Sequence, residues 1–314
     1  MRVFVAGSTG VIGQSLVPLL VECGHEVIAL SRSPQKAKRI EAPGVQVVFA
    51  DAFDRDALTA AIKDSKPEVI IHELTALSQL EANFKKLDEQ FAQTNRLRTE
   101  VTDTLLAAAR LVGARRFIAQ SFCGWTFARE GGPIKSEEAR LDPDPPASFR
   151  KTLAAIRYVE DVVCNASDIE ALALRHGFLY GPGNTMGKGG EVVELICKRQ
   201  FPIVGNGGGI WSFIHVKDAA QATAAAVSRG TAGIYNIVDD EPAPVSEWLP
   251  FLADALGADP PRRIPGWLAR FVIGEGGVSM MTQIRGGSNA KAKREFGWRP
   301  IYQSWRRGFV EDLG

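Results

Sequence analysis

Three regularly spaced glycines near the N-terminus have the pattern of a phosphate-binding turn. The sequence GSTGVIG spans residues 7–13, directly after an apolar run at 2–6 and at the start of an amphipathic stretch. In such a turn Gly7 permits a tight reversal, Gly10 lets the backbone approach a pyrophosphate, and Gly13 lets the helix pack closely on the strand. The N–H groups at the helix N-terminus then face the phosphates. We therefore expect a dinucleotide to contact Gly7, Thr9, Gly10, Val11, Ile12 and Gly13.

The end of the second apolar run, LSRSP at 30–34, bears on which dinucleotide binds. A site for NAD usually carries an acidic side chain here, which binds the ribose hydroxyls. This chain instead has Ser31 and Arg32, with Lys36 one helical turn further on. A guanidinium suits a 2′-phosphate through its charge and its paired donors. The sequence favours NADP(H) over NAD(H); the alternative is a solvated Arg32 in a site that takes either dinucleotide.

Short apolar runs alternate with stretches of helical spacing through the first half of the chain. The apolar runs lie at 2–6, 26–30, 45–49, 68–72, 115–121 and 170–175. Helical stretches separate most of them, for example at 11–23, 54–63 and 88–112. This alternation predicts an α/β fold with a parallel sheet covered on both faces. Further along we expect a loop from about 124 to 147, a strand at 234–238, and helices at 245–257 and 265–273.

The bulk composition argues against several classes of partner. The 314 residues contain 37 Lys and Arg against 36 Asp and Glu, without a basic tract or an acidic tail. We therefore expect neither nucleic acid nor a membrane surface as a partner. The four cysteines are far apart and lack the spacing of metal ligands, and three of them are expected to be inert core thiols. With no signal peptide or membrane-spanning run, the sequence is that of a soluble, cytoplasmic protein.

Other motifs extend the pattern of the glycine turn. Asp51 follows the third apolar run, VIIHELTA occupies 69–76, and LRHGFLYGPGN occupies 174–184. FIHVKDAA at 213–220 and AKAKREFGWRP at 290–300 follow in the second half. Together these motifs resemble the extended short-chain dehydrogenase/reductase family, of the NAD-dependent epimerase/dehydratase type. They occur in the family's order and cover nearly the whole chain.

The resemblance implies a Rossmann-type doubly wound parallel sheet with a smaller, mainly C-terminal substrate-binding region. The dinucleotide-binding domain would comprise residues 1–175 plus about 215–240, and the substrate-binding region residues 176–214 plus 241–314. A homodimer through helices at 88–112 and 148–166 is also implied. Beyond the glycine turn, the cofactor contacts implied are Ser31, Arg32, Asp51, Ala52, Leu74, Thr75, Ala76 and Asn95.

The family's catalytic Tyr-x-x-x-Lys pair is missing from its expected place. An acid often follows that lysine by four residues, so alignment on Glu160 puts Ile156 at the lysine position and Thr152 at the tyrosine position. A threonine hydroxyl is far too weak an acid for this work, and isoleucine carries no charge. Phe122 falls where the family has its serine, and Arg98 where it has an asparagine. The resemblance therefore implies an atypical member of the family.

Two interpretations of this loss are open. In the first, another side chain transfers the proton; the candidates are Ser121, Lys151 and Tyr180, with His176 and Cys123 as further possibilities. Tyr158, which follows Lys151 by seven residues, is expected to pack rather than react. In the second, no protein acid is needed, because an activated acceptor or water suffices when the cofactor carries the difficult step.

Aromatic residues stand where relatives that bind nucleotide sugars have polar ones. Trp211 takes the place of an arginine that holds a pyrophosphate, and Phe178 takes the place of an asparagine. With Phe122, Cys123 and Trp125 these residues predict a mostly apolar pocket for a compact organic molecule. We expect a non-nucleotide substrate, such as a carbonyl, an enone or a polycyclic metabolite; the alternative is that the aromatic residues are core packing.

Three other features have open interpretations. Segment 274–289 contains glycines and two methionines, and is either a flexible lid or an ordinary connector. His215 with Asp218 is expected to brace the substrate loop rather than to react. Glu73, in the cofactor loop, is either an acid near the nicotinamide or a helix-capping partner.

The leading hypothesis is therefore an NADP(H)-dependent oxidoreductase that acts on a small, largely apolar molecule without the usual catalytic pair. A non-redox isomerase, dehydratase or cyclase on the same scaffold is one alternative. A non-catalytic protein that senses the dinucleotide or a metabolite is the other.

Overall fold

The core of the molecule is a seven-stranded, all-parallel sheet. A computed structural model describes residues 1–77 and 83–314. The strand order is β12-β7-β5-β4-β1-β2-β3, so the chain changes direction across the sheet between β1 and β4, where the carboxyl ends of the strands form a crevice. The strands are β1 (Arg2–Ala6), β2 (Glu26–Ser31), β3 (Val45–Phe49), β4 (Val69–His72), β5 (Arg116–Phe122), β7 (Glu170–His176) and β12 (Gly233–Ile237).

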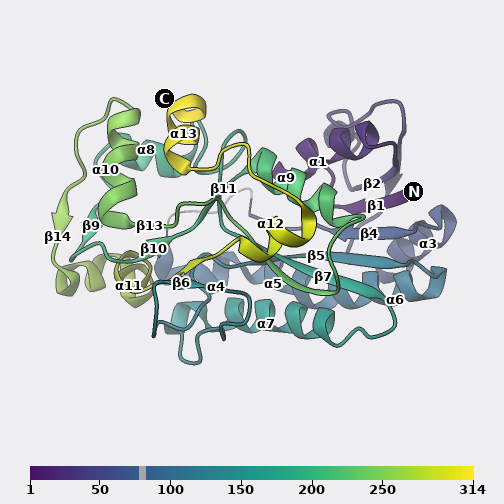
Figure 1. Ribbon diagram of the computed structural model, residues 1–314, viewed down its shortest axis with the longest axis horizontal. Helices are drawn as coiled ribbons and strands as arrows, with labels where there is room; N and C mark the ends of the chain where they lie inside the picture. The colour runs from purple at the N-terminus through teal and green to yellow at the C-terminus, as the bar shows by residue number, and fades with distance from the viewer. Residues whose placement is uncertain (78–82) are drawn as a thin grey trace.

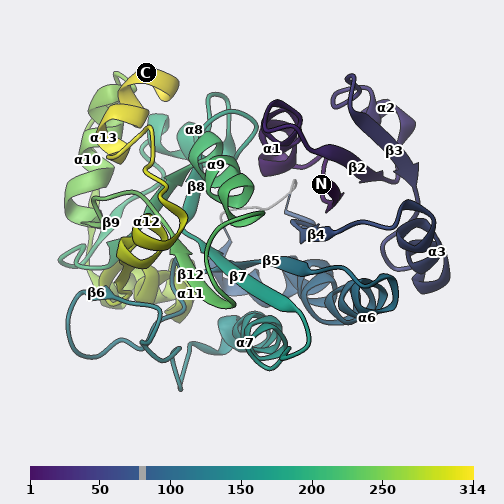
Figure 2. The ribbon, with the colours of Figure 1, turned by 45° about the vertical axis from the view of Figure 1, so that its right-hand side comes forward.

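Helices cover both faces of this sheet (Figure 1). One apolar layer lies between the sheet and α1 (Val11–Glu22), α9 (Val216–Ala226) and α12 (Ala290–Phe296). The opposite layer lies against α3 (Arg55–Ser65), α6 (Thr102–Val112) and α7 (Arg150–Cys164). Figure 2 shows α6 and α7 side by side beneath the strands. Because both faces are buried, the central strands are almost continuously apolar rather than alternating.

A second part of the molecule packs beyond the carboxyl ends of these strands. Its core is rich in aromatic side chains, among them Trp211, Phe213, Trp248 and Trp305. Its helices are α8 (Glu191–Cys197), α10 (Val245–Ala255), α11 (Gly266–Thr282) and α13 (Trp305–Gly308), with the final turn η4 (Phe309–Leu313). Four two-stranded pairs complete it: β8 (Phe178–Tyr180) with β11 (Phe213–His215), β9 (Ile203–Val204) with β14 (Arg263–Ile264), β10 (Ile210–Trp211) with β13 (Ala243–Pro244), and β6 (Ile134–Lys135) with β15 (Gly286–Gly287).

From Phe84 onwards, the segment that precedes β5 is an interrupted helix. It starts with η1 (Phe84–Lys86), α4 (Leu87–Gln90) and α5 (Ala92–Arg96), and widens into a π-helical turn, η2 (Leu97–Val101), before α6. A π-helical turn inside a helix is rare and often occurs at a functional site. The two remaining short elements are α2 (Pro34–Ala37) and η3 (Ala147–Phe149).

Two expectations from the sequence are wrong. Segment 274–289 is not a loop over its whole length, because α11 continues to Thr282 after a break at Gly274 (φ 74°). The glycines beyond the break allow close packing: a Cβ on Gly276 would lie 2.6 Å from the Phe149 ring. Three of the four cysteines, Cys23, Cys164 and Cys197, are exposed rather than buried in the core. Each of them lies at the C-terminal end of a helix.

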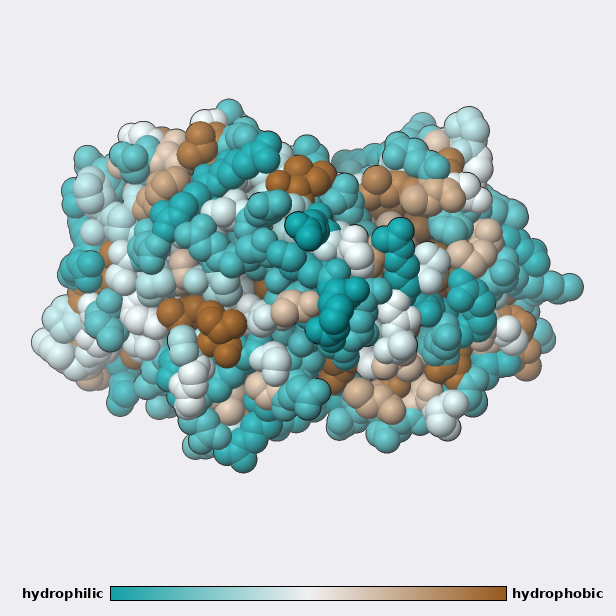
Figure 3. Space-filling view, in the orientation of Figure 1, coloured by the Kyte–Doolittle hydropathy of each residue, from teal (hydrophilic) through white to brown (hydrophobic). Residues whose placement is uncertain are grey.

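The surface carries apolar residues in separate patches. On the face shown in Figure 3, hydrophilic residues surround each apolar patch. No helix among residues 1–77 and 83–314 has both the length and the apolar character needed to span a bilayer. Within the same residues, no group of three or more His, Cys, Asp or Glu side chains is arranged to hold a metal ion.

Candidate active site

The glycine turn leaves room for a phosphate group at the crevice. Gly7 has φ +103°, and a Cβ there would lie 2.6 Å from the backbone carbonyl carbon of Glu73. A Cβ on Gly13 would lie only 2.2 Å from the carbonyl oxygen of Gly7. Gly10 is the N-cap of α1 and offers no side chain to its N–H groups. These free donors at a helix N-terminus suit a pyrophosphate, so the turn fits a dinucleotide.

The end of β2 presents an unpaired cation beside this turn. Ser31 is buried, and its hydroxyl donates to the carbonyl oxygen of Ser33 at 3.0 Å. Arg32 is exposed and forms no hydrogen bond or ion pair with the described residues. Asp51, after β3, is also exposed and accepts a hydrogen bond from the backbone of Phe53 at 3.0 Å. Ala52 beside it is buried.

A buried histidine shapes the loop after β4. Its Nδ1 accepts from the backbone N–H of Leu74 at 3.3 Å, and its Nε2 lies 3.1 Å from the carbonyl oxygen of Leu97. Burial lowers the pKa of His72 to about 4, so the ring is neutral at physiological pH. Two residues further on, the backbone N–H of Ala76 donates to Thr94 at 3.0 Å. Residues 74–76 are therefore held to the helical segment that follows.

Thr152 and Ile156, the residues that the sequence aligned with the family's tyrosine and lysine, take part in packing and capping. Thr152 and Ile156 are both fully buried. Asp88 accepts hydrogen bonds from the backbone N–H groups of Lys151 and Thr152, at 2.9 and 2.8 Å, and from the Thr152 hydroxyl at 2.7 Å. A carboxylate at the start of a helix satisfies its free donors and its dipole. Asn95 adds a hydrogen bond to Thr152 at 3.2 Å.

Ser121 belongs to a buried ion-pair network. Its hydroxyl donates to Glu160 at 2.6 Å, and Arg175 forms a bidentate pair with the same carboxylate at 2.6 and 2.7 Å. Ser121 is inaccessible to solvent. Its proton is committed to Glu160, so the geometry does not support it as a catalytic group.

The other candidate proton donors lie in very different surroundings. Lys151 is exposed on α7. Tyr180 is fully buried; its hydroxyl lacks a partner, and burial raises its pKa well above that of free tyrosine. Burial likewise raises the pKa of Cys123 to about 12. Neither Tyr180 nor Cys123 is therefore suited to give or take a proton near neutral pH. Tyr158 is partly exposed and donates to Asp103 at 2.7 Å.

His176 and Glu73 form a pair that their separation in the sequence conceals. The Nε2 of His176, at the end of β7, lies 3.4 Å from the Glu73 carboxylate at the end of β4, 103 positions earlier in the chain. The hydroxyl of Thr223 donates to the same oxygen at 3.3 Å. The other ring nitrogen of His176 is buried without a partner. This pair and the Asp88 cap were not anticipated, and no local sequence signal could have paired these residues.

Aromatic rings form a continuous wall in the second part of the molecule. Phe178 stacks on Trp211 at 3.9 Å and meets the edge of Phe122 at 5.4 Å between ring centroids. Phe122 in turn lies 6.2 Å from Trp125. Phe122 and Phe178 are only half-buried, whereas Trp125 and Trp211 are buried. Cys123 lies apart from this wall, in a small cluster with Phe127 and Val238.

His215 and Asp218, which were expected to brace the substrate loop, instead bond residues of the C-terminal segment. His215 lies 2.6 Å from the Asp312 carboxylate, and Asp218 accepts from the backbone N–H groups of Ile301 and Tyr302 at 2.6 and 3.0 Å. They tie α9 and the preceding strand to the C-terminal segment.

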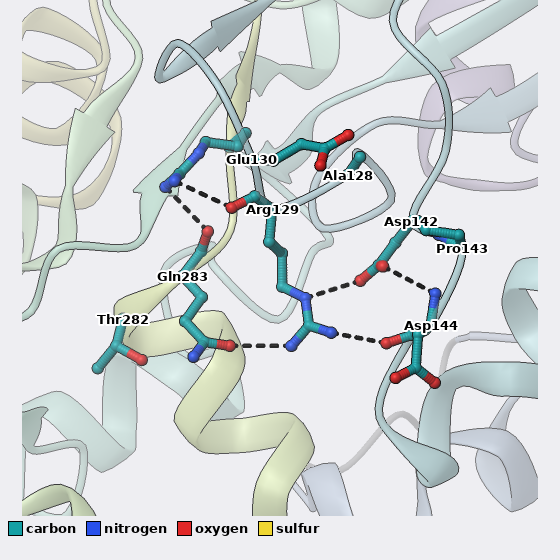
Figure 4. Close-up of a pocket in the computed structure, with 9 residues that line it drawn as sticks. Ala128, Arg129, Glu130, Asp142, Pro143, Asp144, Thr282 and Gln283 are labelled. Carbon is teal, nitrogen blue, oxygen red and sulfur yellow. Dashed lines mark hydrogen bonds and ion pairs between the residues drawn. The ribbon is translucent and has the colours of Figure 1, made fainter.

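A polar surface pocket of about 420 Å³ opens between the 128–144 loop and the end of α11 (Figure 4). Its central cation is already satisfied: Arg129 bonds the Asp142 carboxylate at 2.9 Å, Gln283 at 2.9 Å and a backbone oxygen at 2.6 Å. None of the candidate cofactor or catalytic residues lines this pocket. We therefore place the candidate active site at the crevice, between the glycine turn and the aromatic wall.

Comparison with known proteins agrees with this geometry. Residues 3–238 match the NAD dependent epimerase/dehydratase family. The chain belongs to this family. It is also 42% identical over 309 residues to a 3-diazoavenalumate denitrifying reductase from a Streptomyces species, an alignment that covers 98% of this chain and 99% of the relative. This family member is therefore an NAD(P)-dependent enzyme of the oxidoreductase or epimerase type.

Solved structures of similar fold include complexes with NAD and with NADPH. A UDP-glucose 4-epimerase from Thermotoga maritima, solved with UDP-glucose, has a TM-score of 0.75 at 21% identity, covering 99% of this chain and 96% of that one. A human epimerase family protein solved with NADPH has a TM-score of 0.74 at 19% identity, covering 99% of each chain. At such low identity these likenesses establish the fold alone. The family binds a nicotinamide dinucleotide, as both NAD and NADPH in structural neighbours illustrate.

We predict that Gly13→Ala weakens dinucleotide binding at least about tenfold in a folded protein. The new methyl group would meet the Gly7 carbonyl oxygen, a backbone atom that cannot move without deforming the turn. Calorimetric titration should show an affinity at least about tenfold lower, equivalent to about 1.4 kcal/mol. Gly132→Ala is the matched control, because its Cβ would meet no atom within 4 Å. Unchanged binding by Gly13→Ala would contradict the assignment of the turn.

We also predict an acid-sensitive contribution to stability from His72. Its folded pKa, about 4, lies below the unfolded value of 6.5, so the unfolded state binds the proton more tightly. The contribution is complete above pH 6.5 and is lost as the pH falls towards 4, by up to about 3 kcal/mol. In denaturant unfolding across this range, His72→Gln should show a shallower loss of stability than the wild type. Parallel curves would rule out His72 as the titrating group.

Proposed function

We propose that this chain is an NADP(H)-dependent reductase whose substrate accepts hydride without help from a protein acid. The observation that carries the proposal is the state of Thr152 and Ile156. These buried residues stand in place of the catalytic pair. The Thr152 hydroxyl donates a hydrogen bond to Asp88 at the start of α7. Reduction of an ordinary ketone leaves an alkoxide that needs a proton, which the missing tyrosine would supply.

We propose an aromatic diazonium compound as the substrate. The printed name of the Streptomyces relative, a denitrifying reductase of a diazo compound, supports this class at 42% identity over nearly the full length. When bound, the reduced nicotinamide supplies a hydride and is oxidised. On the substrate a C–H bond forms, the C–N bond breaks with its electron pair passing to nitrogen, and N₂ leaves. The overall change consumes no proton, so the reaction does not require a general acid.

The aromatic wall gives this substrate a place to bind. Phe178 and Phe122 present half-buried rings at the crevice, with Trp211 stacked behind the first. Flat, rigid side chains hold an aromatic ring through area and offset stacking, with few hydrogen bonds. Neither side chain offers the polar contacts that a nucleotide sugar needs. This surface therefore supports a compact aromatic substrate rather than a sugar nucleotide.

The cofactor preference of the proposal rests on Arg32. It is exposed, unpaired with the described residues, and lies at the end of β2, where a 2′-phosphate would be recognised. Arg32→Ala should weaken NADPH binding about tenfold or more, since hydrogen bonds to charged groups contribute about 1.5–3 kcal/mol. NADH binding should change little. Titration of the wild type and of Arg32→Ala with NADPH and with NADH measures these affinities. An equal loss of affinity for the two dinucleotides would contradict the preference for NADP(H).

The activity is tested with NADPH deuterated at the transferable position of C4 and 4-hydroxybenzenediazonium as the acceptor. We expect loss of NADPH absorbance, one N₂ per NADPH, and a phenol that carries deuterium in place of nitrogen. Benzaldehyde and cyclohexenone, whose reduction requires a proton, should be turned over far more slowly. A Thr152→Tyr, Ile156→Lys double variant should not accelerate the diazonium reaction. Faster turnover of the aldehyde than of the diazonium compound would overturn the proposal.

A further inference from the structure

Arg98 is a buried cation without an ion-pair partner among the residues that the structure describes. It lies in the π-helical turn η2 and is 2% exposed, and its Nε and Nη1 have no hydrogen-bond partner within residues 1–77 and 83–314. The other deeply buried arginines are fully engaged: Arg175 pairs with Glu160, and Arg116 bonds Glu170 and three backbone oxygens. An unpaired guanidinium in the interior is costly, so its retention calls for a partner that the described part of the chain does not supply.

Helix packing places the Arg98 guanidinium between α7 and the end of β4, the strand whose carboxyl end borders the crevice. α5, η2 and α6 pack along α7 in the same direction, since Asn95 bonds Thr152 and, further along, Asp103 bonds Tyr158. Side chains on a helix lean towards its N-terminus. The guanidinium accordingly lies back towards Phe91, with its carbon 5.9 Å from the centre of that ring. It interacts electrostatically with Glu160 of α7 and with His72 at the end of β4, so it lies between α7 and the carboxyl end of that strand.

The charge on Arg98 is not neutralised by its neighbours. Glu160 interacts with it electrostatically but is already held by Arg175 and Ser121. His72, the other ionisable group facing it, is neutral at physiological pH. Burial lowers the pKa of Arg98 to about 10, which still leaves it protonated near neutrality. Asn95 is half-buried, and its Oδ1 is a second unpaired atom in the same place.

We infer that Arg98 is the binding site for an anionic oxygen of the substrate, a carboxylate in the first instance. This inference rests on the proposed function, because it assigns one end of the proposed aromatic substrate. The carboxylate end would pair with the guanidinium next to the Phe91 ring. The ring would lie on the wall of Phe122 and Phe178. A buried donor that is left unpaired by a neutral analogue rejects that analogue strongly, so Arg98 would determine specificity as well as affinity.

The test uses two probes of nearly the same shape, cinnamate and cinnamamide, titrated into the protein saturated with oxidised dinucleotide. The wild type should prefer cinnamate by about ten- to hundredfold, the range expected for a charged hydrogen bond. Arg98→Gln should abolish the preference, and Arg98→Lys should keep part of it, because a lysine retains the charge without the paired donors. Arg96→Gln, which removes an exposed arginine two positions away, should leave the preference unchanged.

Two further measurements distinguish a role of Arg98 in binding the anion from a purely structural role. The preference of the wild type for cinnamate should be constant between pH 7 and 9 and fall as the pH passes the pKa of Arg98, about 10. Arg98→Met should be as stable as the wild type or more stable, because it removes an unpaired buried charge. A structural arginine would instead show loss of stability in this variant.

The outcomes distinguish this inference from the proposed reaction. If the wild type does not discriminate between the probes, or if Arg98→Gln still does so while folded and binding dinucleotide, the inference is overturned. If cinnamate preference depends on Arg98 but no diazonium compound is reduced, the anion site stands and the proposed reaction fails. If the diazonium compound is reduced but the wild type shows no preference for cinnamate, the proposed reaction stands and the anion site is overturned.

Discussion

The close approach of Gly7 to the end of β4 is the constraint on which the site depends. The carbonyl carbon of Glu73 lies 2.6 Å from where a Cβ of residue 7 would be, and the Gly7 oxygen lies 2.2 Å from where a Cβ of residue 13 would be. The turn, the first helix and the loop after β4 are therefore fixed relative to one another by contacts between backbones. His72 extends this arrangement by holding Leu74 to the helical segment at Leu97. The cofactor crevice and the opposite wall of the site are thus one rigid unit.

The proposed loss of the catalytic tyrosine and lysine is consistent with the contacts around Thr152. Asp88 caps α7 and accepts hydrogen bonds from the Thr152 backbone N–H and hydroxyl. The Thr152 hydroxyl is therefore held in a stabilising interaction and is not free to act as an acid. Glu160, Arg175 and Ser121 below it form a buried network in which each charge has a partner. Among the described residues, Arg98 and Asn95 on the neighbouring helical segment carry unsatisfied buried polar atoms. On the proposed assignment, the site offers a fixed positive charge but no mobile proton.

Local patterns in the sequence anticipated the parts of the structure that local physics determines. Every predicted strand of the main sheet lies within one residue of its observed position, because short apolar runs between turns permit few alternatives. The sequence did not anticipate that Thr152 and Ile156 lie on a buried helix face. Interactions between distant segments could not be foreseen. Asp88 meets Thr152 across 64 positions and Glu73 meets His176 across 103. Segment 274–289 was misjudged because glycines that permit close packing resemble glycines that permit flexibility.

The proposed chemistry accounts for the combination of features better than any one of them does alone. A protein that had merely lost catalysis would have no reason to keep an unpaired guanidinium in its interior at a cost in stability. A ketone reductase would need an acid where this chain has a capped threonine. Hydride transfer that expels N₂ needs neither an acid nor a base, only a cofactor, a surface for the ring and a handle that fixes the ring's direction. The glycine turn, the wall at Phe178 and the guanidinium of Arg98 correspond to these three requirements. Positioning, rather than proton transfer, is then the main contribution of the protein to the reaction.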